Sequence, residues 1–198
     1  MNSKFPRRGG LLAAMALTLS LFTACFFSRT PPSNYDLTTP DPIPVDYQIK
    51  VSAFSTAGIG HYKMVVRESE NRLKLDEYNR WSQQPGAMIT KYLTAAFAQP
   101  DDRIGTSRRV YYLTGSVMAC ELDKTDGVAY LLIRYAIDCD GVDTVPELGT
   151  VSYRIKVKEA TPDAFAVALS EAANEFALHV KKEIDESIVA QEKTEQRP

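Results

Sequence analysis

The side chains that most often do chemistry are few in this chain and lie far apart in the sequence. His61 and His179 are the only histidines, and the sequence contains neither an H-E-x-x-H motif nor a C-x-x-C motif. Zinc centres need ligands of these types at such close spacings. A lone histidine beside an apolar helical stripe, as at His179, is more often a boundary residue than a ligand. The sequence therefore predicts no metal site.

Motifs for nucleophilic catalysis and for nucleotide binding are also missing. The chain has no G-x-S-x-G and no S-x-x-K, and GIGHYK at 58–63 lacks the spacing of a phosphate-binding loop. The acidic pairs Asp101–Asp102 and Asp138/Asp140 fall in predicted turns, where aspartate is favoured for hydrogen bonding. We therefore expect a protein that is not an enzyme, with no catalytic residues and no cofactor.

Composition and charge narrow the class further. The chain has 198 residues, of which 44% are hydrophobic, as in an ordinary folded protein with one domain. From Cys25 onward, 20 basic residues stand against 25 acidic ones. Binding to nucleic acid requires a clustered positive footprint, so this class of partner is not expected.

Cys25 follows a segment with the three parts of a secretory signal. MNSKFPRRGG is basic, LLAAMALTLSLFTA is a continuous apolar run of 14 residues, and its last residues, Thr23 and Ala24, are small. Apolar runs of ~7–15 residues are typical of signal peptides, whereas a spanning helix needs ~20. An uncleaved anchor that extends through Phe27 is the alternative.

The residues L-F-T-A-C at 21–25 resemble a bacterial lipobox, although Phe22 stands where leucine is usual. The resemblance implies that the Cys25 sulfur receives a diacylglycerol, that cleavage occurs just before it, and that the new amine is acylated. Residues 1–24 would then be a lipoprotein signal peptide, and acyl chains such as palmitate would hold Cys25 on a membrane. The other interpretation is a signal-peptide cysteine without lipid.

Cys120 and Cys139 form an even pair that a disulfide could join in an oxidising compartment. Both lie in a predicted hairpin whose apolar pattern pairs Leu113 with Ile137, Gly115 with Tyr135, Val117 with Ile133, and Ala119 with Leu131. In this register Gly115 would make room for the tyrosine ring. Cys120 points to the opposite face, about 26 Å of strand from Cys139, whereas a disulfide needs Cα atoms within ~7 Å. We expect both thiols to be free.

Hydrophobic periodicity predicts the order β-β-β-α-β-β-β-α. A Pro-rich tether and entry segment at 25–46 precedes one domain at 47–190, and residues 191–198 are predicted to be a flexible tail. The expected elements are strands at 47–54, 62–67, 72–78, 108–122, 128–139 and 149–158, a helix from Pro85, and a C-terminal helix of about 25–28 residues that Thr161 caps. This is an α+β fold, a mainly antiparallel sheet with two helices packed on one face.

The segment 64–85 is the most distinctive part of the chain, because it contains the only tryptophan. One interpretation is structural: Tyr78 and Trp81 cover the sheet where the chain turns into the first helix. The other is that the segment contacts a partner, since Trp, Tyr and Arg dominate binding hot spots. The candidate contact residues are Arg67, Tyr78, Arg80 and Trp81.

Residues 35–190 resemble the ABC-type transport auxiliary lipoprotein family. The motifs that carry the resemblance are Tyr35-Asp-Leu37, Val66-Arg67 and the run Tyr78-Asn-Arg-Trp81-Ser-Gln-Gln-Pro85. Members include envelope lipoproteins of the paraquat-inducible protein C type. They accompany ABC transporters whose substrate-binding subunit carries a mammalian-cell-entry domain and which move lipids between the inner and outer membranes.

This resemblance implies a non-catalytic, lipid-anchored accessory subunit of an intermembrane lipid-transport system. It implies a periplasmic domain that contacts the mammalian-cell-entry-domain component, and Phe26 after the modified cysteine implies anchoring at the outer membrane. A homo-oligomer is also possible. The alternative is a free-standing envelope lipoprotein that binds lipid or peptidoglycan without a transporter, and a hydrolase is a more distant third.

Overall fold

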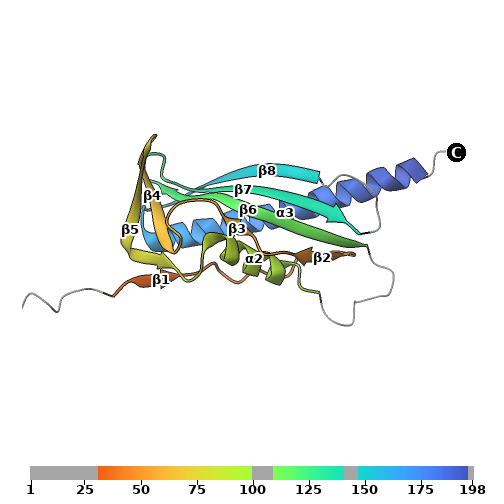
Figure 1. Cartoon of the computed structure of the whole chain (residues 1–198), viewed down its shortest axis with the longest axis horizontal. Helices are drawn as coiled ribbons and strands as arrows, with labels where there is room; N and C mark the ends of the chain where they lie inside the picture. Colours follow the sequence, from red (N-terminus) through yellow and green to blue (C-terminus); the bar gives the residue numbers. More distant parts are fainter. Residues whose placement is uncertain (1–30, 100–108, 141–146, 196–198) are drawn as a thin grey trace, which may run out of the picture. The chain divides into compact units, whose positions relative to one another are not determined.

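The fold is known from a computed structural model that describes residues 31–99, 109–140 and 147–195. One compact unit begins at Pro32. Its elements are β1 (Ser33–Tyr35), β2 (Gln48–Val51), β3 (Ser55–Thr56), β4 (Lys63–Ser69), β5 (Arg72–Trp81), α2 (Pro85–Ala96), β6 (Val110–Asp123), β7 (Val128–Cys139), β8 (Glu147–Lys156) and α3 (Pro162–Glu195). The α+β class, the two helices and the long C-terminal helix are confirmed (Figure 1).

The sheet is mainly antiparallel, as predicted, and it also contains shorter parallel pairings. Its strands run in the order β1-β5-β4-β6-β7-β8, and β2 and β3 also pair with β6. The hairpins β4–β5 and β6–β7 and the pair β7–β8 are antiparallel, as predicted. Parallel pairing joins β6 to β2, then to β3, then to β4, one after another along the same edge. The chain from 48 to 67 thus accompanies β6 in three short pieces.

A register shift in β6 changes which residues face the core. Val117 pairs with Ile133, as predicted, but Ala119 pairs with Leu132 and Cys120 with Leu131. The extra residue reverses the alternation of side chains. Consequently Cys120 is buried in the core and does not point to the opposite face, which corrects the predicted orientation.

The two thiols that the structure describes are free, as expected. Cys120 pairs with Leu131 near the β6–β7 turn, whereas Cys139 pairs with Tyr111 at the far end of the hairpin. Burial, followed by the nearby Glu121 charge, raises the pKa of the Cys120 thiol far above its usual value. This thiol therefore stays protonated and behaves as a small apolar side chain.

Helix α3 carries the largest share of the core. Thr161 caps it as predicted, accepting a hydrogen bond from the Ala164 N–H at 3.3 Å. Its inward stripe includes Phe165, Phe176 and Ile184, each at most 1% exposed. The helix continues to Glu195, so the predicted tail boundary at residue 191 falls inside it. No helix among the described residues is both long enough and apolar enough to cross a membrane.

Helix α2 begins at Pro85, as predicted, and packs into the same core. Its buried residues include Met88, Ile89 and Leu93. The Thr90 hydroxyl accepts the Phe54 N–H at 2.8 Å and donates to the Gly86 carbonyl, which fixes the helix against the chain between β2 and β3. Both helices therefore share one hydrophobic cluster with the sheet.

The entry segment belongs to the folded unit from Ser33 onward. β1 pairs with β5, and Ile43 and Val45 are buried at 8% and 6% exposure. The entry part of the predicted tether and entry segment at 25–46 therefore packs on the domain, where Ile43 and Val45 join the core. Residues 1–30, including the predicted signal peptide and Cys25, lie outside the described residues.

Tyr135 connects the sheet to α3 through a small polar network. Its hydroxyl donates to Glu183 Oε2 at 2.7 Å and lies 2.9 Å from His179 Nε2, and His179 Nε2 lies 3.2 Å from Glu183 Oε1. Burial, strengthened by Glu183, raises the pKa of the phenol well above its usual value. His179 is thus a structural partner on α3.

The glycine that makes room for the Tyr135 ring is Gly149, and this corrects the prediction for Gly115. A Cβ atom on Gly149 would lie 2.2 Å from Tyr135 Cζ, whereas one on Gly115 would lie 2.3 Å from the Phe54 ring. Gly115 does pair with Tyr135 across the hairpin, as predicted. Its missing side chain, however, accommodates Phe54.

We predict that Gly149→Ala destabilises the fold by about 1–3 kcal/mol, the usual cost of overpacking. The new methyl group would push the Tyr135 ring away from Glu183 and His179. Gly58→Ala is the matched control, because its Cβ would meet only a backbone oxygen at an ordinary 3.5 Å. Urea unfolding of the variants measures the difference. Equal stability of Gly149→Ala and the wild type would contradict the assignment of this space to Tyr135.

Candidate partner-binding site

Trp81 is a core residue. It is 1% exposed and packs edge-to-face on Phe165 with ring centroids 5.2 Å apart. Its backbone N–H donates to the Tyr62 carbonyl at 2.6 Å. The structural interpretation is therefore correct for Trp81, and its side chain does not reach the surface as the partner-contact hypothesis required.

Tyr78 is on the surface, because an irregularity in β5 pushes it outward. Leu75 pairs with Val65 and Arg80 with Lys63, so four residues of β5 lie opposite a single residue of β4. The Asp76 carboxylate holds this bulge by accepting the N–H groups of Tyr78 and Asn79 at 2.9 and 3.0 Å. Tyr78 is 63% exposed.

The Asp76 carboxylate is ionised as part of this bulge. Its burial opposes ionisation, but the Asn79 amide and the two backbone N–H donors outweigh that effect and hold the pKa of Asp76 below its usual value. The bulge also carries Glu77, which pairs with Lys63 at 2.7 Å. Local hydrogen bonds of this kind make the outward position of Tyr78 a built feature.

A recess of about 310 Å³ lies beside Tyr78. Its lining comes from the bulge, from β4 and from the β6–β7 turn, and comprises Val66, Lys74, Asp76, Glu77, Tyr78, Asn79 and Lys124. The recess combines an exposed phenol with two ammonium groups over a buried valine. Arg80, by contrast, is half-buried, and its Nε is buried without a hydrogen-bond partner among the described residues.

Arg67 is engaged in a largely buried ion pair. Its Nε donates to Glu121 Oε2 at 2.7 Å, and its Nη1 donates to the Glu70 carbonyl at 2.7 Å. The Glu121 side chain is 9% exposed and that of Arg67 26%. The guanidinium group therefore joins the tip of the β4–β5 hairpin to β6.

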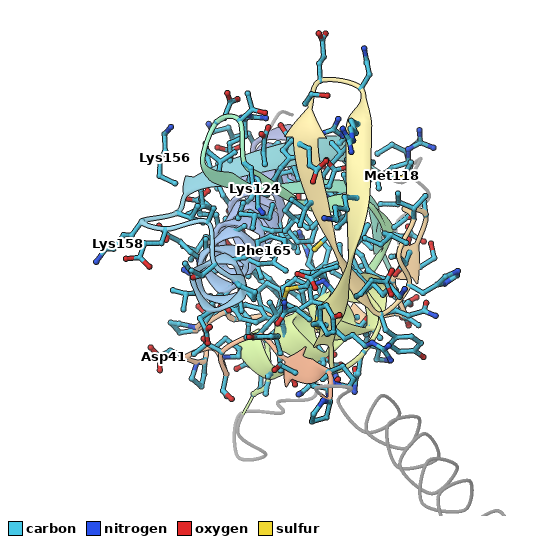
Figure 2. All side chains as sticks on the ribbon, turned by 90° about the vertical axis from the view of Figure 1, so that its left-hand side faces the viewer. Asp41, Met118, Lys124, Lys156, Lys158 and Phe165 are labelled. Carbon is cyan, nitrogen blue, oxygen red and sulfur yellow. The ribbon has the colours of Figure 1, made fainter. Side chains whose placement is uncertain are left out.

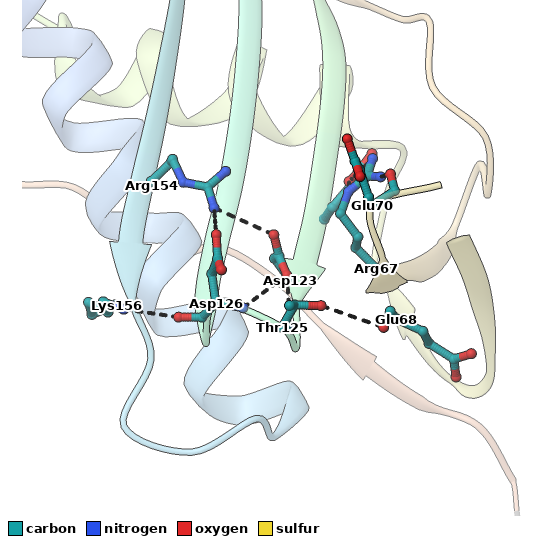
Figure 3. Close-up of polar contacts among 9 residues, drawn as sticks. Arg67, Glu68, Glu70, Asp123, Thr125, Asp126, Arg154 and Lys156 are labelled. Carbon is teal, nitrogen blue, oxygen red and sulfur yellow. Dashed lines mark hydrogen bonds and ion pairs between the residues drawn. The ribbon is translucent and has the colours of Figure 1, made fainter. Parts of the chain in front are cut away.

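Arg67 borders a second groove, on the opposite face of β4 from the recess beside Tyr78. This groove, of about 440 Å³, is lined by Arg67, Ser69, Glu70, Asp123, Thr125, Asp126, Tyr130 and Arg154. Arg154 pairs with Asp123 and Asp126 (Figure 3). Its guanidinium group also lies over the Tyr130 ring, 5.4 Å from the ring centroid. Adjacent residues of a strand face opposite sides of the sheet. Val66 lines the recess and Arg67 lines the groove, so the two depressions lie on opposite faces of β4.

The structure thus separates the four predicted contact residues. Tyr78 is exposed and available to a partner, Arg67 and Arg80 are half-buried, and Trp81 is buried. The sequence analysis missed Asp76, Glu121 and Arg154, which organise this end of the sheet. The D-x-x-N spacing of Asp76 and Asn79 inside a strand pattern was the one available signal for the bulge.

Several described polar groups of this end hold the strands together. Figure 2 looks onto this end, with Lys124 and Lys156 at the strand turns. Lys156 donates to the Asp126 carbonyl at 2.9 Å, and Thr125 donates to the Glu68 carbonyl at 3.5 Å. Among the described residues, no three of His, Cys, Asp and Glu are grouped so as to hold a metal ion.

We predict that Arg67→Ala destabilises the domain by about 3 kcal/mol, because Glu121 would remain buried without its partner. The matched variant replaces both residues, as Arg67→Met with Glu121→Leu, and should recover most of the loss. Chemical denaturation of the two variants and the wild type provides the comparison. A cost near that of a surface pair, below about 1 kcal/mol, would show that the pair is unimportant.

Comparison with known proteins identifies the family. No curated protein matches the sequence. The structure resembles the crystal structure of protein XCC0632 from Xanthomonas campestris, of the DUF330 family, with TM-score 0.61, 18% identity, and coverage of 83% of this chain and 100% of that one. A second crystal structure, of an uncharacterized protein, has TM-score 0.59 and 14% identity and covers 78% and 99%.

These two likenesses concern the fold, and the sequence itself carries the family assignment. Residues 47–181 match the model of the ABC-type transport auxiliary lipoprotein component. The matched range runs from the residue before β2 to the middle of α3, so it contains both depressions described above. The chain is therefore a member of the ABC-type transport auxiliary lipoprotein component family.

Proposed function

We propose that this protein is a lipid-anchored, non-catalytic accessory subunit of an intermembrane lipid transporter, and that it docks with the mammalian-cell-entry-domain component at the outer membrane. Membership of the auxiliary family supports the general role. The observation that carries the docking proposal is the bulge that presents Tyr78 at 63% exposure, held in place by Asp76. An exposed phenol on a preorganised backbone is a typical anchor for a partner.

The position of the bulge fits a domain held close to a membrane. Ser33 pairs with Asn79, the neighbour of Tyr78. Only the residues 26–32 separate Ser33 from Cys25, and eight extended steps reach at most about 29 Å. If Cys25 bears lipid, this short reach keeps the bulge close to the membrane surface. A transporter component that extends to the outer membrane would meet the bulge there.

We expect Cys25→Ala to abolish attachment of lipid. In wild-type cells, radiolabelled palmitate should be incorporated and the protein should sediment with the outer membrane. In the variant, the label should disappear and the signal segment should be retained, since the acceptor sulfur is missing. A variant that still incorporates palmitate and keeps the same mature size would rule out Cys25 as the attachment site.

A photocrosslinking amino acid at position 78 tests the docking proposal. We expect Tyr78→p-benzoylphenylalanine to form a crosslink with the mammalian-cell-entry-domain protein in intact membranes. The same replacement at Val167, which is 65% exposed on α3, is the control and should give no such product. The proposal fails if position 78 yields no crosslink to that protein or if both positions yield it equally.

A further inference from the structure

Strand β8 leaves one edge of the sheet open. Its ten residues, Glu147–Lys156, pair with β7 in an unbroken register, and no described segment pairs with the other side (Figure 1). The opposite edge of the sheet is β1, with only three residues. Proteins usually shorten, bulge or cover an edge strand to prevent pairing with other chains. β8 contains no proline and shows no bulge, and at its start Leu148 is 77% exposed.

The hydrogen-bond pattern shows which backbone groups are free. The Val157 N–H donates to the Gly127 carbonyl at 3.0 Å, just beyond the end of the strands. In an antiparallel pair the bonded residues alternate, so the odd residues of β8 bond to β7. The even residues from Leu148 to Lys156 therefore direct their N–H and C=O groups toward the open edge.

Helix α3 packs against β8 and carries three glutamates and one histidine along one side. Glu171, Glu175, His179 and Glu183 follow one another at i, i+4 spacing, which places them on one ridge of the helix. Glu183 and His179 are bound to Tyr135. Glu171 and Glu175 are exposed and form no ion pair with any described residue. Like charges at this spacing slightly destabilise an isolated helix, so a cation beside these two carboxylates would be favourable.

Tyr153 lies between the open edge and the acidic ridge. Its hydroxyl is buried and has no hydrogen-bond partner among the described residues. Burial, followed by the charges of Glu175 and Glu183, raises the pKa of the phenol to about 12. A buried donor without a partner is uncommon.

We infer that the open edge of β8 and the Glu171–Glu175 ridge form a docking groove for an extended segment of another protein, with basic side chains turned toward α3. The segment would add a strand to the sheet, and its main chain would bond to the even residues of β8. Its basic side chains would neutralise the two free carboxylates. This inference does not depend on which protein supplies the segment.

A second copy of the chain fits the groove poorly. Twofold pairing of β8 with itself would place the symmetry axis near Val151 and Ser152. Because Glu175 is close enough to Tyr153 to raise the pKa of its phenol, such pairing would place the Glu175 carboxylates of both copies on the same face of the joined sheet. Such like-charge contacts are unfavourable, so the charge distribution favours a basic partner.

Two blocked, fluorescent ten-residue peptides test the groove, one alternating lysine and threonine and the other glutamate and threonine. We expect the lysine peptide to bind the full chain in detergent about tenfold more tightly than the glutamate peptide, as measured by fluorescence anisotropy. Ser152→Pro should weaken binding about tenfold, because it removes an outward N–H and no bond to β7. Ser152→Ala keeps that N–H and is its control.

Charge variants provide a second test that is independent of the proline. Glu175→Lys should also weaken binding of the lysine peptide about tenfold, whereas Glu192→Lys, with the same change of charge near the end of α3, should leave it within about twofold. The inference is overturned if neither peptide binds, if both bind equally, or if Ser152→Pro and Glu175→Lys bind like the wild type. It is also overturned if sedimentation shows that Ser152→Pro disrupts a dimer of the wild type.

Discussion

The pairing of β6 with the segments on both sides of it is the interaction on which the rest of the structure depends. β6 bonds to β7 along nearly all of its length, and its other edge binds β2, β3 and β4 in turn. Of these three, β2 and β3 pair with no other described strand, whereas β4 also pairs with β5. The register shift at Val117–Ala119 then changes the inward face, so that Leu113 and Val117 face the core in the first half and Cys120 and Leu122 in the second.

Helix α3 fixes this sheet through a contact that depends on one missing side chain. Gly149 leaves the space through which the Tyr135 ring reaches Glu183 and His179. The same helix packs Phe165 on Trp81, which ties the β4–β5 hairpin to the core. Titratable side chains that could suggest catalysis are thus engaged in holding elements together.

Most elements could be predicted from the sequence because their signals are local. The alternation in β7 and β8, the Thr161 cap and Pro85 at the start of α2 each depend on neighbouring residues. The parallel pairing along β6 could not be predicted from the sequence. It joins segments about 60 residues apart, and no tight turn between them sets the register. The shift after Val117 has no glycine to signal it, and Gly115 was paired correctly but assigned to the wrong ring.

The candidate site was harder to predict than the fold. Trp81 and Tyr78 stand three residues apart in one strand, so alternation predicts opposite faces for them, but it does not tell which face is covered. In the structure Trp81 is 1% exposed and Tyr78 is 63% exposed. In the sequence, Glu171 and Glu175 are indistinguishable from an ordinary solvated helix face. Only the structure shows that the helix that carries them packs against the edge strand β8. Partner contacts depend on such long-range juxtapositions, which periodicity does not encode.

The central claim is that the outer edge of β8, along its ten residues, pairs with no other described segment of the chain. Residue-resolved amide hydrogen exchange on the full chain without any partner tests this directly. The odd residues of β8, from Gly149 to Ile155, should be protected by their bonds to β7. The even residues, from Thr150 to Arg154, should exchange far faster. Equal protection of both sets in the absence of a partner would mean that the edge is already covered, and would contradict the claim.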